Sequence, residues 1–228
     1  FSREELKSSY ERFSVPSNTV VTVVGDMDAG KVKERIGEIF GKIPARDPDT
    51  PEVAQEQPLN AVREKIVRIP RAKAHLAIGF RGTTLSDEDR YPLEVLNNIL
   101  AGQGGRLFTN LRDKESLAYT VTSFDRPGLD PGSVVLYMAC DVSKVDRALP
   151  GLMKQIELVR QKPLDEPELQ RSITNLVGTH LIALQSSWSR AENTALNTLY
   201  GLGYNYDKEY IKKIKEVKAE DVLRVARK

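Results

Sequence analysis

The sequence has few of the residues that form disulfides, bind metals or activate nucleophiles. Its 228 residues include one cysteine, Cys140, and two histidines, His75 and His180. A single cysteine excludes an internal disulfide and leaves the cellular compartment undecided. A serine or cysteine nucleophile also lacks support, because no histidine is a plausible base for one. We expect Cys140 and both histidines to be structural.

Excess charge and long apolar runs are missing as well. The 34 basic and 32 acidic residues leave a formal net charge of +2, so no net field favours nucleic acid or an anionic membrane. No apolar run approaches the roughly 20 residues that a membrane-spanning helix requires. Four tyrosines that could stack on bases have only scattered lysines near them, and we expect them to pack against helices: Tyr200, Tyr204, Tyr206 and Tyr210. We therefore predict neither nucleic acid nor a membrane as a partner.

The order of the predicted elements indicates the fold class. Hydrophobic residues make up 40% of the chain, which is enough for a sizeable core. Runs rich in apolar and β-branched residues predict strands at 19–24, 62–69, 74–80 and 133–141. Helical spacing predicts helices at 2–13, 32–40, 86–100, 145–159, 169–184, 188–199, 207–214 and 220–226. Because strands come early and helices late, without the alternation of a parallel sheet, we predict an α+β fold with a mostly antiparallel sheet packed on helices.

Residues 44–58 are predicted to be a linker. They contain four prolines and several acids without any periodicity, which is typical of a connection between domains. The chain begins with Phe1 rather than methionine and shows no signal peptide. We expect it to be an excised or processed piece of a longer protein.

The stretch from Gly102 to Val121 reads as a glycine turn, a short helix and the start of a strand. On the helix, Leu107 and Leu111 form one apolar stripe, and Phe108 and Arg112 form a second stripe about 100° round the axis. Arg112 is therefore expected off the buried face. The glycines are explained by helix termination and close approach of the chain: Gly102, Gly104 and Gly105.

After Ser116 the apolar pattern of this stretch changes to alternation. Leu117, Tyr119 and Val121 are each two residues apart, so we expect them to share one face of a strand. Taken by itself, the chemistry of Arg112 and Tyr119 is compatible with a surface arginine and a half-buried tyrosine.

The run G-G-R-L-F-x-x-L-R-x-K-x-x-L-A-Y-x-V at residues 104–121 resembles the carboxy-terminal half of the pitrilysin-type zinc peptidases, the inverzincins of family M16. The resemblance extends over essentially the whole chain. It implies that Arg112 and Tyr119 reach across a closed chamber to an unstructured peptide held at a zinc site on the other half. It also implies that Phe108 lines the substrate chamber.

The resemblance further implies how the chain is divided. Residues 1–43 look like the tail of the preceding half, with a helix, a strand and a helix, and 59–228 look like the substrate-binding half without its last strand. A sheet that lacks a strand exposes an edge of unpaired backbone groups. We expect residues 19–24 to fill the vacant place, either within one chain or by strand exchange in a homodimer.

This chain cannot supply the zinc site of an inverzincin by itself. The site needs H-x-x-E-H, with two histidines on one helical turn and a glutamate base between them. His75 and His180 are 105 positions apart. The resemblance therefore implies no metal on this chain. It places zinc on a half or subunit that carries H-x-x-E-H, and it implies that the chain alone is inactive.

Two alternatives remain open. Residues 25–31 fit the phosphate-binding pattern G-x-x-x-x-G-K between a strand and a helix, but Val32 replaces the hydroxyl that would bind magnesium. Asp26 and Asp28 would also face the phosphates, and Asp28 is explained equally well as a helix N-cap. The other alternative is a non-catalytic assembly subunit with the M16-like fold. The presence of H-x-x-E-H upstream or in a neighbouring gene would distinguish that subunit from a peptidase.

Overall fold

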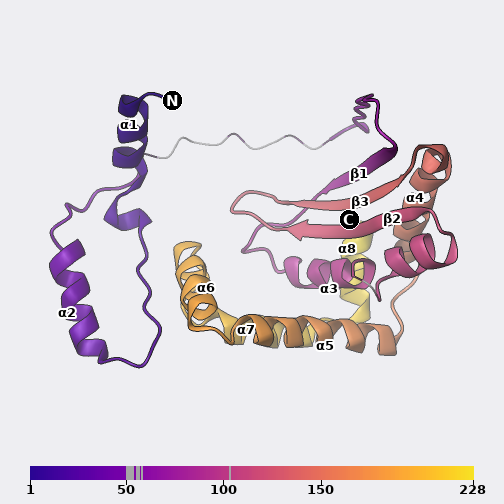
Figure 1. The fold of residues 1–228 in the computed structure, drawn as a ribbon. Coiled ribbons are helices and arrows are strands. Elements are labelled where there is room, and N and C mark those ends of the chain that lie inside the picture. Colours follow the sequence, from indigo (N-terminus) through magenta and orange to yellow (C-terminus); the bar gives the residue numbers. More distant parts are fainter. Residues whose placement is uncertain (50–53, 55–56, 58, 103) are drawn as a thin grey trace. The chain divides into compact units, whose positions relative to one another are not determined.

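The computed structural model describes residues 1–228 apart from 50–53, 55–56, 58 and 103. Figure 1 shows the elements in the colours of the sequence. The chain divides into two compact units. Unit 1 contains Phe1–Ile69 and Leu184–Tyr204, and unit 2 contains Pro70–Ala183 and Asn205–Lys228. Within the described ranges, no helix is both long and apolar enough to cross a bilayer.

Local capping explains where the helices of unit 1 begin. Helix α1 (Arg3–Phe13) starts at a capping box, in which Ser2 Oγ accepts the Glu5 N–H at 3.2 Å and Glu5 Oε2 accepts the Ser2 N–H at 2.6 Å. The reciprocal bonds satisfy amides that have no partner inside the helix. The predicted helix start is therefore confirmed. A 3₁₀ turn, η1 (Pro16–Asn18), and helix α6 (Ser187–Leu199) also belong to this unit.

Helix α2 (Ala29–Phe40) begins at Asp28, as the sequence predicts. The Asp28 carboxylate accepts the backbone N–H of Gly30 at 2.8 Å and that of Lys31 at 3.1 Å. In a phosphate-binding loop, the amides at this helix start would contact the phosphate. Because a carboxylate already satisfies these two amides, the structure gives no support to the nucleotide-binding alternative.

The predicted strands at 19–24 and 62–69 are wrong, because the structure forms no strand at either segment. A β-branched run fits a pleated, half-buried surface, but it becomes a strand only beside a partner backbone. In residues 19–24, the Thr22 hydroxyl instead donates to the Ala191 carbonyl of α6 at 2.7 Å. The proposal that this segment fills the vacant place in a sheet, either within one chain or by exchange between two chains, stays a prediction. Part of the predicted linker 44–58 lies outside the described residues.

The described residues of unit 2 form an antiparallel sheet of three strands. Strands β1 (Lys73–Arg81), β2 (Ala118–Arg126) and β3 (Ser133–Asp141) lie in the order β1-β3-β2, so β3 is central and the other two form the edges. Alternate residues of β3 point into the core: Val134, Leu136, Met138 and Cys140. The predicted strands at 74–80 and 133–141 are confirmed, and Cys140 is a buried core residue as expected.

The helices of unit 2 pack on one face of this sheet (Figure 1). They are α3 (Arg90–Leu100), α4 (Val145–Gln161), α5 (Glu166–Ala183), α7 (Tyr206–Glu216) and α8 (Ala219–Arg227), with a 3₁₀ turn η3 (Val142–Lys144) and a π-helix η2 (Phe108–Lys114). Their apolar stripes meet the inward side chains of the strands in one core. The fold is α+β, as predicted, and the described helices of this unit leave the opposite face of the sheet open.

Candidate functional site

Three departures from regular backbone geometry follow one another between residues 108 and 120. The first is the π-helix η2, the second is Ser116 with a positive φ of 51°, and the third is a β-bulge between Ala118 and Thr120. A π-helix, a left-handed non-glycine residue and a bulge each cost free energy relative to regular structure, and all three are found preferentially at functional sites. This segment contains all three predicted site residues.

The π-helix separates a buried stripe from an exposed one. Leu107 and Leu111 are fully buried in the core, whereas Arg112 is exposed and Phe108 is half-buried. The guanidinium carbon of Arg112 lies 4.7 Å from the centroid of the Phe108 ring. The prediction that Arg112 lies off the buried face is therefore confirmed. The Phe108 ring and the Arg112 guanidinium therefore make a cation–π contact.

The bulge changes the direction of Tyr119. The prediction that Leu117, Tyr119 and Val121 share one face is wrong, since Leu117 and Val121 are 2% and 6% exposed and Tyr119 is 69% exposed. One extra residue in β2 breaks the alternation between Ala118 and Thr120. The tyrosine side chain therefore points out of the core, although the residues two positions before and after it are buried.

Lys73 is the neighbour of Tyr119 that sequence reasoning did not find. Its Nζ lies 3.4 Å from the centroid of the Tyr119 ring. Strand alternation places Lys73 on the same face as His75, and its cross-strand partner is Asp141. The only sequence signal for Lys73 is its position at the start of a predicted strand. Its contact with Tyr119 depends on the pairing of three strands.

The structure brings Arg112 together with Phe108 and places Tyr119 beside Lys73. In the described part of the chain, no hydrogen bond, ion pair or cation–ring contact joins Arg112 to Tyr119, and the Tyr119 hydroxyl has no hydrogen-bond partner. The segment between them is tied down at Ser116, whose carbonyl accepts Lys144 Nζ at 2.8 Å. Both hydrogen-bonding groups are therefore available to another molecule.

The described residues do not fit a zinc site. Among them, no group of three or more histidine, cysteine, aspartate or glutamate side chains could hold a metal ion. His75 Nδ1 lies 2.6 Å from the Tyr137 hydroxyl, and His180 Nε2 lies 3.4 Å from Asp207 Oδ1. Burial lowers the pKa of His180, and Asp207 opposes this shift. The two histidines belong to different elements, β1 and α5.

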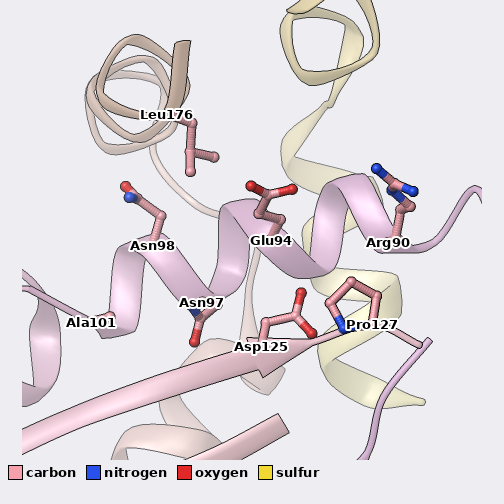
Figure 2. A pocket seen from close by; sticks show the side chains of 8 residues that line it. All are labelled: Arg90, Glu94, Asn97, Asn98, Ala101, Asp125, Pro127 and Leu176. Carbon is pink, nitrogen blue, oxygen red and sulfur yellow. The ribbon is translucent and has the colours of Figure 1, made fainter. Parts of the chain in front are cut away.

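A second polar site lies on the helical side of the sheet. This pocket, with a volume of about 250 Å³, is lined by residues of α3, α5 and the end of β2 (Figure 2): Arg90, Glu94, Asn97, Asn98, Ala101, Asp125, Pro127 and Leu176. Figure 2 shows Asp125 extending from the end of β2 toward α3. Sequence reasoning missed the pocket, because its acids are single carboxylates in an apolar helix and at a strand end.

Two of the three charged groups that line this pocket, Arg90 and Glu94, are bonded to the fold rather than arranged around a reaction centre. Arg90 is buried and donates to the Leu85 carbonyl and the Tyr206 hydroxyl. The Tyr210 hydroxyl donates to Glu94 Oε1 at 2.5 Å, while burial raises the Glu94 pKa. Burial, together with the charge of Glu94, raises the pKa of Asp125 to about 6. The pocket therefore holds a carboxyl group that changes its charge near neutral pH.

The comparison with known families matches most of the chain. The family model described as the peptidase M16 inactive domain covers residues 1–176. The chain belongs to this M16 family. The resemblance to family M16 found at residues 104–121 is thereby confirmed, and the chain is an M16 inactive domain.

Relatives of this M16 domain are about twice its length. An uncharacterized zinc protease of Streptomyces coelicolor is 27% identical over an alignment of 231 positions, which covers 98% of this chain and 50% of the relative. The uncharacterized zinc protease YmxG of Bacillus subtilis is 26% identical over an alignment of 229 positions, which covers 100% of this chain and 55% of the relative. The chain thus spans about half the length of the relatives that it matches.

Solved structures show the same fold for the M16 domain. A protease from Helicobacter pylori superposes with a TM-score of 0.89 at 20% identity, over 99% of this chain and 55% of that chain. A peptidase M16 inactive domain from Pseudomonas fluorescens gives a TM-score of 0.75 at 16% identity, over 100% of this chain and 54% of that chain.

Proposed function

We propose that this M16 domain is the substrate-binding half of a zinc-dependent endopeptidase, and that it binds an unstructured peptide through Arg112 and Tyr119. The observation that carries the proposal is the β-bulge, which turns Tyr119 out of the core to 69% exposure beside the π-helix that bears Arg112. The residues two positions before and after Tyr119 are buried, and a tyrosine that pointed inward with them would gain free energy from burial. Its exposure on an irregular backbone instead suits contact with a ligand.

Arg112 and Tyr119 have the chemistry that this role requires. A guanidinium and a phenol are hydrogen-bond donors, and a peptide carbonyl is an acceptor. Negative charge develops on the carbonyl oxygen when the peptide bond is attacked, and fixed donors stabilise this charge. The guanidinium of Arg112 lies over the Phe108 ring, and a guanidinium carries five N–H donors in one plane. Phe108 supplies an apolar wall next to them.

The peptide is proposed to bind as an additional strand. Within the described residues of unit 2, the sheet ends at β1 on one side and at β2 on the other, and the edge strands of a sheet present backbone groups for pairing. An extended, unstructured peptide pairs with such an edge without unfolding first. This geometry favours unstructured peptides over folded proteins as substrates.

Zinc, its histidines and the general base are proposed to lie on a half that carries H-x-x-E-H. The relatives named zinc proteases are twice the length of this chain, which leaves room for such a half. It would belong either to the same polypeptide or to a separate subunit. Because this chain spans about half the length of these relatives, we also propose a domain division. Residues 1–43 would be the tail of the preceding half, and residues 59–228 would be the substrate-binding half.

Substitution of the two donors in the complete protein tests the proposal. Arg112→Met or Tyr119→Phe is expected to lower kcat/KM for peptide hydrolysis by about 10- to 1000-fold, as for the loss of one donor to a developing oxyanion. Tyr204→Phe is the matched control, since Tyr204 is 68% exposed. Arg160, an exposed arginine paired with Glu157, is the control for Arg112. Unchanged turnover in the site variants, with an intact fold, would remove the proposed role.

A non-catalytic assembly subunit is the second candidate. The apolar residues on one face of α1 favour an interface with further protein, since Leu6, Tyr10 and Phe13 are 61%, 70% and 39% exposed. A search of the complete protein and its neighbours for H-x-x-E-H separates the two candidates. Its presence supports the peptidase, and its absence from both supports the assembly subunit.

A further inference from the structure

Tyr119 needs a partner that fixes its side chain. The residue lies on a bulge, is 69% exposed, and has a hydroxyl without a hydrogen-bond partner among the described residues. An exposed side chain with no contacts moves among its rotamers. The contact that the structure provides is the Lys73 ammonium, 3.4 Å from the ring centroid. A cation over the face of the ring leaves the hydroxyl at the ring's edge free.

Lys73 lies beside an anion on the central strand. In the sheet order β1-β3-β2, Lys73 starts one edge strand and Tyr119 belongs to the other, so the lysine side chain crosses β3. Its cross-strand partner on β3 is Asp141, whose carboxylate accepts Ser143 N at 2.9 Å and Ser143 Oγ at 2.6 Å. These bonds lower the Asp141 pKa, with further contributions from Lys144 and Lys73. A fixed anion therefore attracts the lysine toward the site of the tyrosine.

We propose that Lys73 is a positioning residue that holds the Tyr119 ring over the end of the sheet, with its hydroxyl directed at the bound peptide. The inference rests on the proposed function of Tyr119 and adds a residue from another strand to that site. A cation over an exposed aromatic ring changes the population of the oriented ring by about 2- to 5-fold. Because the Tyr119 donor acts mainly as charge develops on the carbonyl oxygen, the effect belongs in kcat rather than in KM.

The catalytic test uses the complete peptidase and a double-mutant cycle. Lys73→Met is expected to lower kcat by about 2- to 5-fold with KM unchanged, and Lys73→Arg is expected to restore most of the activity because it keeps the cation. In a Tyr119→Phe background, Lys73→Met is expected to have no further effect. The matched control is Arg126→Met, because Arg126 lies over the Phe124 ring at 5.8 Å at the other end of β2. This control is expected to leave kcat unchanged.

The outcomes separate the inference from the proposed function. If Lys73→Met lowers kcat equally with and without the Tyr119 hydroxyl, Lys73 does not act through Tyr119 and the inference is wrong. If Tyr119→Phe leaves turnover unchanged, the proposed function fails. NMR spectroscopy then tests independently whether Lys73 positions the Tyr119 ring. In the complete protein with ¹³C-labelled tyrosine, Lys73→Met is expected to shift the NMR signal of Tyr119. The shift is expected to bring it closer to the signal of the exposed Tyr204. A signal that moves no more than in the Arg126→Met control overturns the inference, whatever the activity.

Discussion

Replacing Asp125 with asparagine is expected to stabilise the fold above pH 6. One oxygen of this carboxylate, Oδ1, is buried without a hydrogen-bond partner among the described residues. Burial and the nearby charge of Glu94 on α3 raise the Asp125 pKa from 3.8 to about 6, while Arg90 opposes the shift. The protonated carboxyl therefore contributes stability below about pH 4, and this contribution is lost as the pH rises through about 6. Asparagine keeps the shape and removes the charge.

The size of the effect follows from the shift in pKa. A change from 3.8 to about 6 corresponds to roughly 3 kcal/mol at pH 8, at about 1.36 kcal/mol per pKa unit. Water on the partly exposed side of Asp125 screens some of this penalty, so we expect Asp125→Asn to raise the free energy of unfolding by about 1–3 kcal/mol. Urea unfolding followed by circular dichroism between pH 4.5 and 8 measures the difference.

The pH profile decides whether this reasoning holds. The stability gain of Asp125→Asn is expected to shrink as the pH falls from 8 toward 4.5. The control is Asp130→Asn, an exposed carboxylate on the connection between β2 and β3, which is expected to change little across this range. A gain that is independent of pH, or a loss of stability at pH 8, would show that Asp125 is not a buried, uncompensated charge.

Three further substitutions test local features by urea unfolding. Gly105→Ala is expected to lower the free energy of unfolding by about 1–3 kcal/mol, because a Cβ there would lie 1.9 Å from the Ala101 carbonyl oxygen. Equal stability would mean that the turn has room to relax. Ser116→Gly is expected to add about 1 kcal/mol by relieving the left-handed backbone at φ 51°, and a loss would place the strain elsewhere. Asp28→Ala is expected to cost about 1 kcal/mol by uncapping α2, and an unchanged midpoint would contradict the capping role.

Features that depend on local chemistry could be predicted from the sequence. Ser2 with Glu5 and Asp28 cap helices where the pattern places them, because a cap needs a side chain and amides only two or three residues away. The exposure of Arg112 follows in the same way from its separation from the Leu107 stripe. The α+β class follows from the order of such elements along the chain.

Features that depend on distant partners could not be predicted. Residues 19–24 and 62–69 have strand composition, yet a strand forms only where another backbone accepts its hydrogen bonds. The bulge before Thr120 is a property of the pairing between β2 and β3, so alternation alone put Tyr119 on the wrong face. The contact of Lys73 with Tyr119 spans three strands and leaves no pattern in the sequence.

The central claim is that Tyr119 faces a peptide and takes part in its hydrolysis. The most direct measurement compares kcat/KM for an unstructured peptide in the complete protein with Tyr119→Phe and with the equally exposed control Tyr204→Phe. The account predicts a decrease of about 10-fold or more for Tyr119→Phe and no change for the control. Equal activity in both variants, with the fold of each intact, would contradict it.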